Sequence, residues 1–449
     1  MSTIEKHDMT QGKILLPLVS FTIPLVLGNL FQLTYNAADS VIVGKYVGEQ
    51  ALAAVGTSTP IMNIAILLIS GMCMGASVLM SSQYGAKDYD TLSRQISTTM
   101  LAGCGFSVVF SLLMLFLANP VLRLIRVPET AIPESAAYLR IIFMGLIFTF
   151  MYNFLANTMR ALGDSKTPLY FLVTSAFLNI FGDLFFVVVL RWGVAGSAIA
   201  TVCSEGLCCL LCGIYIKKKI PLLCLGKKWW VFDKSLLGKT VSYGSTSAMQ
   251  QVCLQLGKLI IQSVVNTQGV AVMAAFTAVN RVDDFAYTPQ QNIGHAMTTF
   301  LAQNKGAGHK ERMKKGFQTG LLIELVYSIG LFCVIWGLAP QIMTLFAEDG
   351  DAQVVSLGIS YLHLISWMYI LPGLTNGVQG FFRGIGDLKV TLYSTFMNMF
   401  GRVVAVFVMI RLLQMEFASL AWANMVGWIV MLLFEVPLLV KSMRNGECG

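Results

Sequence analysis

Long apolar runs separated by short polar breaks make up most of the chain. An α-helix needs about 20 apolar residues to cross about 30 Å of hydrocarbon. Runs of that length occur at residues 14–42, 51–80, 95–119, 136–158, 168–190, 194–216, 235–265, 270–300, 317–341, 354–380, 390–411 and 417–440. The pattern therefore predicts an all-α polytopic membrane protein with twelve transmembrane helices.

The second half of the chain repeats the first at an interval of roughly 222 residues. RALGDSKTPLY at 160–170 returns as RGIGDLKVTLY at 383–393, and VAGSAIAT at 194–201 returns as FASLAWAN at 417–424. Each half holds six apolar runs, and because six is even, both copies enter the membrane in the same orientation. Two parallel six-helix repeats are typical of secondary transporters, with the substrate route between the halves. The predicted domains are an N-lobe at 1–216, a basic cytoplasmic linker at 217–234 and a C-lobe at 235–449.

Composition and charge place the chain in a membrane with a defined orientation. Hydrophobic residues make up 56% of the chain and charged residues 12%, whereas about a quarter of the residues of soluble proteins are charged. Most of the 31 lysines and arginines fall in segments that are cytoplasmic if both termini are cytoplasmic, as the positive-inside rule requires. We expect a multi-pass plasma membrane protein without a removable signal peptide. The net charge of +8 then reflects topology and contact with anionic lipid, and not nucleic-acid binding.

The cysteines do not indicate a cofactor or a disulfide framework. Most of the ten lie inside apolar runs, where cysteine behaves as a small hydrophobe. The CCxxC sequence at Cys208, Cys209 and Cys212 has a metal-ligand spacing but no histidine or acid on the same turn. We therefore expect no structural metal and no cofactor. Separately, we expect the chain to be monomeric.

The first apolar run contains an acidic residue at membrane depth, where acidic residues are rare. Asp39 is the only charged residue of the segment from Pro24 to Gly44, and an ionisable residue at membrane depth is by default a candidate functional site. A polar stripe of one helix face leads to it, since Asn29, Gln32, Asn36 and Asp39 are spaced three, four and three residues apart. Tyr35 lies one helical turn before Asp39. A capping residue at the helix end is the alternative interpretation of this acid.

A second acid and several amides occur in the later runs of the same half. Asn179 and Asp183 are four apart and share a helix face. Asn153 and Asn157 form a similar pair, and Thr201 lies in the sixth run. An ionised carboxylate is costly in hydrocarbon unless it binds a proton or a cation. Carboxylate, amide and hydroxyl oxygens also suit sodium, a hard cation. The residues alone leave proton and sodium open.

The second half keeps the amides of this pattern but not the two acids. Asn153 projects onto Asn376 and Thr201 onto Asn424 at an offset of 223, and Asn179 projects onto Asn398 at 219, where Asp183 meets Arg402. In the seventh run the position equivalent to Asp39 is Ile261. A polar stripe nevertheless remains there at Gln251, Gln255, Lys258 and Gln262. Other charges of this half, Arg281, Asp283, Asp284, Glu324 and Glu435, could pair with Lys258 and Arg402 or contact the substrate directly. Arg281 and Asp284, three residues apart, could also neutralise each other. We expect cation coupling in the N-lobe and a substrate surface in the C-lobe.

The order of several motifs resembles the multidrug and toxic compound extrusion (MATE) transporters. These motifs are DSVIVGKYVG at Asp39, LAAVG at Leu52, QYGAKD at Gln83 and the two RxxGD loops. The resemblance implies two six-helix bundles, a first helix that bends at Pro24 as a hinge, and an N-lobe acid network that takes up protons or sodium. Carried over residue by residue, that network comprises Tyr35, Asp39, Asn153, Asn179, Asp183 and Thr201. The tenth run, LPGLTNGVQG at 371–380, departs from members that carry acids there.

These observations together favour a proton- or sodium-coupled antiporter that exports amphipathic, cationic compounds by alternating access. Candidate residues of the substrate cavity are Asn29, Gln32, Asn36, Asn157, Gln251, Gln255, Lys258, Gln262, Asn376, Asn398 and Arg402. A flippase or exporter of a lipid-linked or anionic metabolite is the alternative, suggested by Lys258, Arg281 and Arg402. An enzyme is disfavoured because HExxH and GxSxG do not occur in the sequence. A channel is disfavoured because the broken repeat gives no ring of equivalent ligands.

Overall fold

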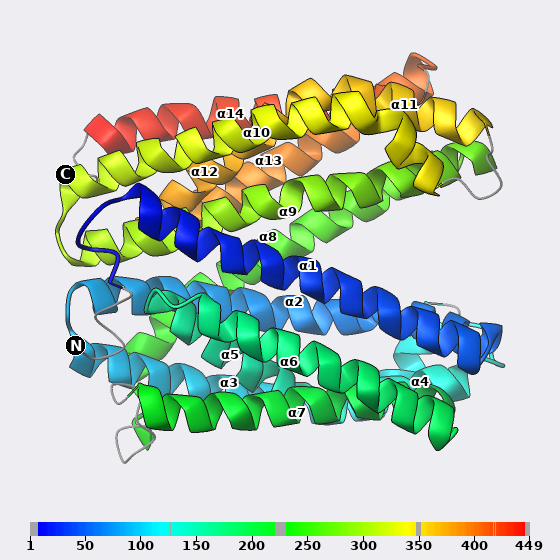
Figure 1. Cartoon of the computed structure of the whole chain (residues 1–449), viewed down its shortest axis with the longest axis horizontal. Helices are drawn as coiled ribbons and strands as arrows, with labels where there is room; N and C mark the ends of the chain where they lie inside the picture. The colour runs from blue at the N-terminus through cyan, green and yellow to red at the C-terminus, as the bar shows by residue number, and fades with distance from the viewer. Residues whose placement is uncertain are drawn as a thin grey trace. The chain divides into compact units, whose positions relative to one another are not determined.

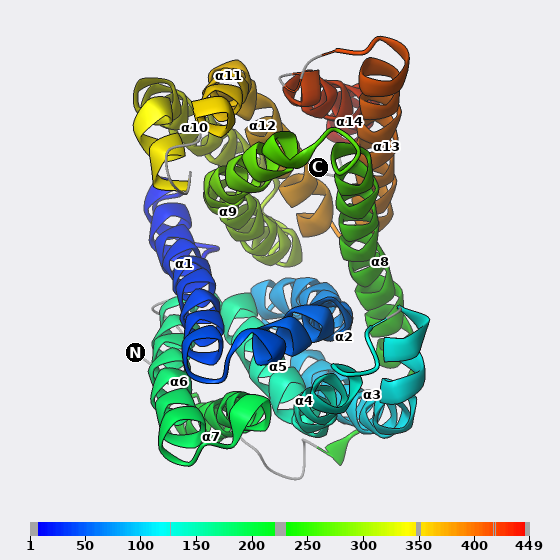
Figure 2. The ribbon, with the colours of Figure 1, turned by 90° about the vertical axis from the view of Figure 1, so that its right-hand side faces the viewer.

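The computed structural model describes residues 8–125, 127–220, 230–346, 352–415, 417 and 419–444. Residues 221–229, half of the expected linker, lie outside this description. The chain divides into two compact units, the first formed by residues 1–8 and 23–248 and the second by residues 9–22 and 249–449. Helices run side by side within each unit (Figures 1 and 2).

The first unit holds the helices of the first repeat. They are α1 (Leu15–Tyr46, from Ile23 onward), α2 (Glu49–Gly85), α3 (Tyr89–Leu124), α4 (Ile132–Met144), α5 (Leu146–Ala161), α6 (Lys166–Asp183), the π-helical segment η2 (Leu184–Val189), α7 (Gly193–Lys219) and the first part of α8 (Lys234–Val265). A core of buried apolar side chains joins α2, α3, α4, α5 and α7.

The second unit repeats this order of elements. It holds the rest of α8, then α9 (Val270–Gly306), α10 (Lys310–Phe346), α11 (Ala352–Ser366), the 3-10 turn η6 (Trp367–Tyr369), α12 (Ile370–Gly384), α13 (Leu388–Phe407), the π-helical segment η7 (Val408–Leu412) and α14 (Ser419–Arg444). Its own apolar core includes Tyr361, Tyr369 and Trp428. The start of α1 belongs to this unit, where the Arg312 guanidinium donates hydrogen bonds to the carbonyls of Met9, Gln11 and Gly12.

The predicted twelve spans and their repeat are confirmed. Nine described helical segments are long and apolar enough to cross a membrane, and α4 with α5, bent by 46°, makes a tenth. The two remaining spans, α8 and α9, carry more polar side chains. The helices also extend beyond the predicted runs, as α3 does beyond 95–119, because a capped helix continues past the hydrocarbon.

Backbone irregularities recur at the repeat interval. Positive φ angles occur at Gly48 and Gly269, at Lys87 and Gly308, at Gly163 and Gly386, and at Arg191 and Gln414. The break between α4 and α5 is matched by η6, and both α6 and α13 end in π-helical segments, at Val189 and Leu412. These last two ends are 223 residues apart. At this interval Asn179 of the first repeat corresponds to Arg402 of the second, and Asp183 corresponds to Val406. The 219-residue offset that the sequence suggested for this helix is therefore wrong.

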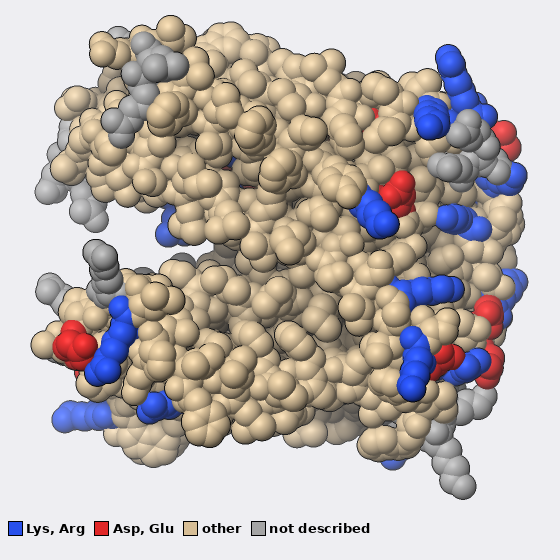
Figure 3. All heavy atoms as spheres, turned by 180° about the vertical axis from the view of Figure 1, so that it is seen from behind, with Lys and Arg blue, Asp and Glu red and all other residues tan. Residues whose placement is uncertain are grey.

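Charged side chains lie mainly toward the helix ends. On the face in Figure 3, lysine, arginine, aspartate and glutamate gather near the two ends of the helices, and most of the surface between them is uncharged. Large apolar side chains such as Phe116, Val109 and Phe181 are exposed along the helices. Exposed apolar side chains between charged ends fit contact with lipid, so the chain is a multi-pass membrane protein.

Candidate functional site

The Asp39 carboxyl group is held between two helices of the first unit. Asp39 lies on α1 and is half-buried, and its Oδ1 accepts a 2.7 Å hydrogen bond from Ser197 Oγ near the start of α7. Ser197 itself is fully buried. Since a hydroxyl donor stabilises an ionised carboxylate, this contact fixes Asp39 toward the interior of the unit.

Asp183 is the more isolated of the two predicted acids. It is the last residue of α6, directly before the π-helical segment η2, and its side chain is fully buried. The Asp39 carboxyl lies close enough to interact with it electrostatically. In the described part of the chain, neither Asp183 oxygen accepts a hydrogen bond of standard geometry. A carboxyl with so few partners is stable there only with a proton or a bound cation.

Asn179 and Thr201 complete the polar cluster. Asn179 Nδ2 donates a 3.1 Å hydrogen bond to Thr201 Oγ1, which joins α6 to α7. The amide nitrogen is thereby occupied, while Asn179 Oδ1 has no hydrogen-bond partner among the described residues. The structure thus brings together two carboxyls, an amide oxygen and hydroxyl groups from α1, α6 and α7. We call Asp39, Asn179, Asp183, Ser197 and Thr201 the N-lobe acid cluster.

The other predicted residues of the first unit lie on α1 and α5. Tyr35 is half-buried on α1 and interacts electrostatically with Asp39. The amide groups of Asn153 and Asn157 donate to the carbonyls of Thr149 and Asn153, within α5. Along α1, Pro24 is buried, Asn29 half-buried and Gln32 exposed, and the side chain of Asn36 lies outside the described residues.

The predicted polar stripe of the second unit lies on α8. Gln251 is half-buried, Gln255 is exposed, and Gln262 Nε2 donates a 2.7 Å hydrogen bond to Asn266. Lys258 Nζ lies 3.3 Å from Asp284 Oδ1 of α9. Asp284 therefore pairs with Lys258, one of the partners that the sequence left open for it, and not with Arg281. Helix packing brings α8 beside α9, which sequence spacing within α9 could not reveal.

A second polar cluster lies deeper in this unit, around Asp283. Tyr369 Oη donates to Asp283 Oδ1 at 2.6 Å and Tyr361 Oη donates to Oδ2 at 3.1 Å. Asn424 Nδ2 donates to Tyr361 Oη at 2.8 Å, and the half-buried Arg402 lies near the carboxylate. Asp283 is thus well partnered, unlike Asp183. Of the remaining predicted residues, Asn398 is buried on α13 and Asn376 donates to the carbonyl of Pro372 within α12.

Comparison with known proteins places this architecture in a family. The MatE family model matches residues 24–185 and 247–409, one match for each repeat. The chain is 32% identical to the probable multidrug resistance protein YpnP of Bacillus subtilis over 87% of its own length and 86% of the relative's. The chain belongs to the MatE family of membrane transporters. It is also 23% identical to the probable multidrug resistance protein NorM of Thermotoga maritima, over 92% of this chain and 89% of that one.

Solved structures share the MatE fold along the whole chain. A MOP superfamily transporter from Pyrococcus furiosus matches with a TM-score of 0.90 and 21% identity, covering 99% of both chains. MATE structures in a straight and in a bent conformation match with TM-scores of 0.91 at 21% identity, over 100% of this chain. The likeness confirms the predicted two-repeat architecture.

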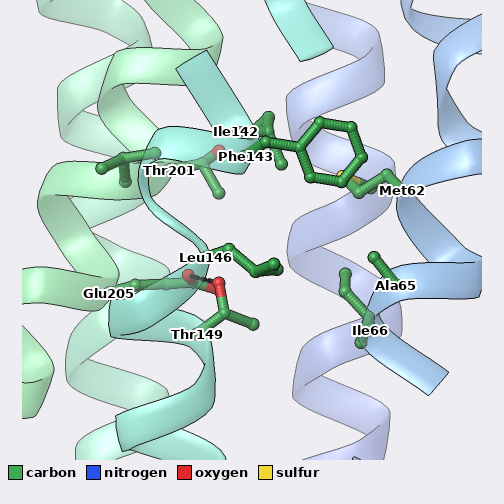
Figure 4. Close-up of a pocket in the computed structure, with 10 residues that line it drawn as sticks. Met62, Ala65, Ile66, Ile142, Phe143, Leu146, Thr149, Thr201 and Glu205 are labelled. Atoms are coloured by element: carbon green, nitrogen blue, oxygen red, sulfur yellow. Dashed lines mark hydrogen bonds between the residues drawn. The ribbon is translucent and has the colours of Figure 1, made fainter. Parts of the chain in front are cut away.

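One acid of this MatE chain escaped the sequence analysis. Glu205 lies on α7, one helical turn after Thr201, and accepts a hydrogen bond from Thr149 Oγ1 of α5 (Figure 4). The signal was present, because Glu205 is the only charged residue between Gly193 and Ile216. It was overlooked because the polar residues of α7 do not form the regular stripe that marks α1.

Proposed function

We propose that this MatE chain is a cation-coupled antiporter that exports amphipathic, cationic organic compounds by alternating access, with a proton or a sodium ion as the coupling ion. The proposal rests on the proximity of Asp39 to Asp183. Asp183 is a buried carboxyl, and no lysine, arginine or histidine of the described residues pairs with it. Such a carboxyl exchanges a cation or proton, and occupancy then changes the packing of α1, α6 and α7.

The proposed coupling site comprises Asp39 and Asp183, with Tyr35, Asn153, Asn179 and Thr201 around them. Pro24 is the proposed hinge. Proline removes one backbone hydrogen bond from its helix, and the division of α1 between the two units falls at residues 22 and 23, beside Pro24. A bend there would let occupancy of the acid cluster alter the course of α1.

The substrate class rests on the relatives and on the polar stripe of the C-lobe. YpnP and NorM are both named as probable multidrug resistance proteins. The chain has 24 methionines, whose flexible side chains suit permissive pockets. We propose that Gln251, Gln255 and Gln262 of α8 contribute to the substrate cavity. The protein would act as a monomer in the plasma membrane, with cytoplasmic termini and lobes at 1–216 and 235–449.

An anionic or lipid-linked substrate is the second candidate, and Arg402 favours it. Arg402 Nε has no hydrogen-bond partner among the described residues. The alternative Lys258 is already paired with Asp284. If the substrate is anionic, Arg402→Gln abolishes its transport; if the substrate is cationic, efflux of a cationic dye survives this change.

The proposed function is tested by efflux from proteoliposomes under separately imposed pH and sodium gradients. Wild-type protein is expected to drive accumulation of a cationic dye with one of the two gradients. Asp39→Asn is expected to lose the gradient-driven component while keeping dye exchange without a gradient. Gradient-driven accumulation by Asp39→Asn at the wild-type rate would overturn the proposal.

A further inference from the structure

A small cavity lies beside Glu205 inside the first unit. Its volume is about 20 Å³, and its walls come from α2, α4, α5 and α7. Figure 4 shows Glu205 and Thr149 pointing toward one another, with Met62, Ala65 and Ile66 on α2. A space of roughly 10–15 Å³ or more holds one water molecule if polar groups line it. Glu205, Thr149 and Thr201 supply those groups, and the other walls are apolar.

Among the residues that the structure describes, none supplies a compensating positive charge near Glu205. No lysine, arginine or histidine of the described residues pairs with it. The titratable side chains that interact electrostatically with it are Tyr35 of α1 and Tyr138 of α4, and both tyrosines also interact with Asp39. Both tyrosines are neutral at physiological pH because their ordinary pKa is about 10. Thr149 Oγ1 is the one described hydrogen-bond donor to the Glu205 carboxyl.

Thr201 connects this cavity to the N-lobe acid cluster. It lines the cavity, lies one turn before Glu205 on α7, and accepts the hydrogen bond from Asn179 Nδ2. A threonine hydroxyl both donates and accepts. Thr201 therefore joins this cavity to Asn179, which lies one helical turn before Asp183 on α6.

We propose that Glu205, positioned by Thr149 and hydrated in this cavity, is a second proton-binding carboxyl of the transport cycle, in addition to the Asp39–Asp183 pair. The inference rests on the proposed function, because it assigns a further coupling proton to the same exchanger. In the protonation step, a proton that reaches the cavity as a hydronium ion passes to a Glu205 oxygen and leaves a water molecule behind. The reverse transfer leaves the carboxylate, which Thr149 Oγ1 stabilises.

The chemistry of the cavity favours a proton over a metal cation. Hard cations such as Ca²⁺ take about six to eight oxygen ligands, whereas only Glu205, Thr149 and Thr201 place side-chain oxygens here. A purely structural hydrogen bond to Thr149 is the competing explanation. Such a bond would not require a carboxyl group, since an amide of the same shape accepts it equally well.

The test compares wild type, Glu205→Gln and the surface control Glu129→Gln in proteoliposomes with a pH gradient. The readout is the steady-state accumulation ratio of a cationic dye. If one coupling proton is lost, a gradient of one pH unit supports a ratio about tenfold lower. We expect this tenfold fall for Glu205→Gln, wild-type accumulation for Glu129→Gln, and unchanged dye exchange without a gradient for both. A merely structural role would not change the ratio without also reducing exchange.

The outcomes separate this inference from the proposed function. An unchanged ratio in Glu205→Gln overturns the second proton site and leaves the antiporter intact. Accumulation driven by sodium alone also overturns the inference but not the antiporter, whereas wild-type protein that responds to neither gradient overturns the proposed function itself. If Glu205→Gln and Glu205→Ala both lose exchange while Thr149→Val keeps it, the carboxyl is a structural group and the inference is wrong.

Discussion

Hydroxyl groups from other helices hold two acids of the first unit, since Ser197 of α7 donates to Asp39 and Thr149 of α5 donates to Glu205. Asp39 and Asp183 stood out because amides precede them at helical spacing, and the structure brings them together. The sequence could not show that Ser197 donates to Asp39, because the contact joins residues 158 positions apart. It also gave no sign that Asn153 and Asn157 use their amide nitrogens within α5. Side-chain partners depend on packing, which helical periodicity does not specify.

The hydroxyl of Thr201 gives a prediction for the coupling site. Thr201→Val keeps the shape of the side chain but removes the acceptor for Asn179 Nδ2. A hydrogen bond contributes about 1 kcal/mol, so the concentration of coupling ion at half-maximal exchange should rise about fivefold. Exchange assays over a range of ion concentrations measure this change. Thr201→Ser retains the hydroxyl and should behave as wild type; an equal effect in both variants would contradict the assigned role.

Close helix contacts in the second unit depend on glycines that the sequence could only suggest. Gly373, Gly377, Gly380 and Gly384 follow one another on α12 at intervals of four, three and four residues. A Cβ atom at Gly380 would lie 2.7 Å from the carbonyl oxygen of Gly294 on α9. Small residues at such positions let membrane helices approach closely. The spacing indicates a packing face, but only the structure identifies α9 as the partner at Gly380.

Gly380→Ala should therefore destabilise the second unit. Overpacking of a tight interface costs about 1–3 kcal/mol, which thermal unfolding of the purified protein in detergent can measure. Gly330→Ala on the exposed face of α10, where nothing lies within 4 Å of a new Cβ, is the matched control. Alanine is a better helix former than glycine, so Gly330→Ala should be neutral or slightly stabilising. Equal unfolding temperatures for the two variants would contradict the proposed close contact.

The start of α3 gives a second prediction for a single helix. Asp88 is the N-cap residue, and its side chain accepts a 3.1 Å hydrogen bond from Thr91 N. This bonding holds the pKa of Asp88 below its usual range. Because the folded-state pKa is lowered, the stabilisation is present at neutral pH and is lost as the pH falls through the acid range.

Asp88→Ala should lower stability by at most about 1 kcal/mol at pH 7, since the cap is exposed to solvent. Asp88→Asn also caps well and should differ little from wild type. Unfolding of the three proteins at pH 7 and near pH 3 measures the effect, and the difference between wild type and Asp88→Ala should shrink at the lower pH. A difference that grows on acidification would contradict the capping role.

The sequence predicted the plan of the whole molecule better than its details. Twelve apolar runs and a repeat near 222 residues were sufficient for two parallel six-helix repeats. The 46° bend between α4 and α5 was not predicted, since residues 141–148 around the break are continuously apolar. Nor did hydropathy reveal that α1 and α8 each divide between the two compact units, at residues 22 and 248. A continuous helix has no hydropathy break where its packing partners change.

Membrane orientation gives a prediction for the whole molecule. If both termini are cytoplasmic, Glu129 between α3 and α4 faces outward and Lys314 at the start of α10 faces the cytoplasm. Glu129→Cys should react with a membrane-impermeant thiol reagent in intact cells, and Lys314→Cys should react only after permeabilisation. Wild-type protein controls for the native cysteines. The opposite labelling pattern would require the inverted topology.

The central claim is that coupling resides in the acid cluster of the first repeat, and one measurement tests it most directly. Gradient-driven dye accumulation is compared between Asp183→Asn and Asp283→Asn, which neutralise one buried carboxyl in each repeat. We predict that Asp183→Asn loses accumulation under either ion gradient, while Asp283→Asn still responds to the gradient that drives wild type. Accumulation that survives Asp183→Asn and disappears in Asp283→Asn would place the coupling in the second repeat and contradict this account.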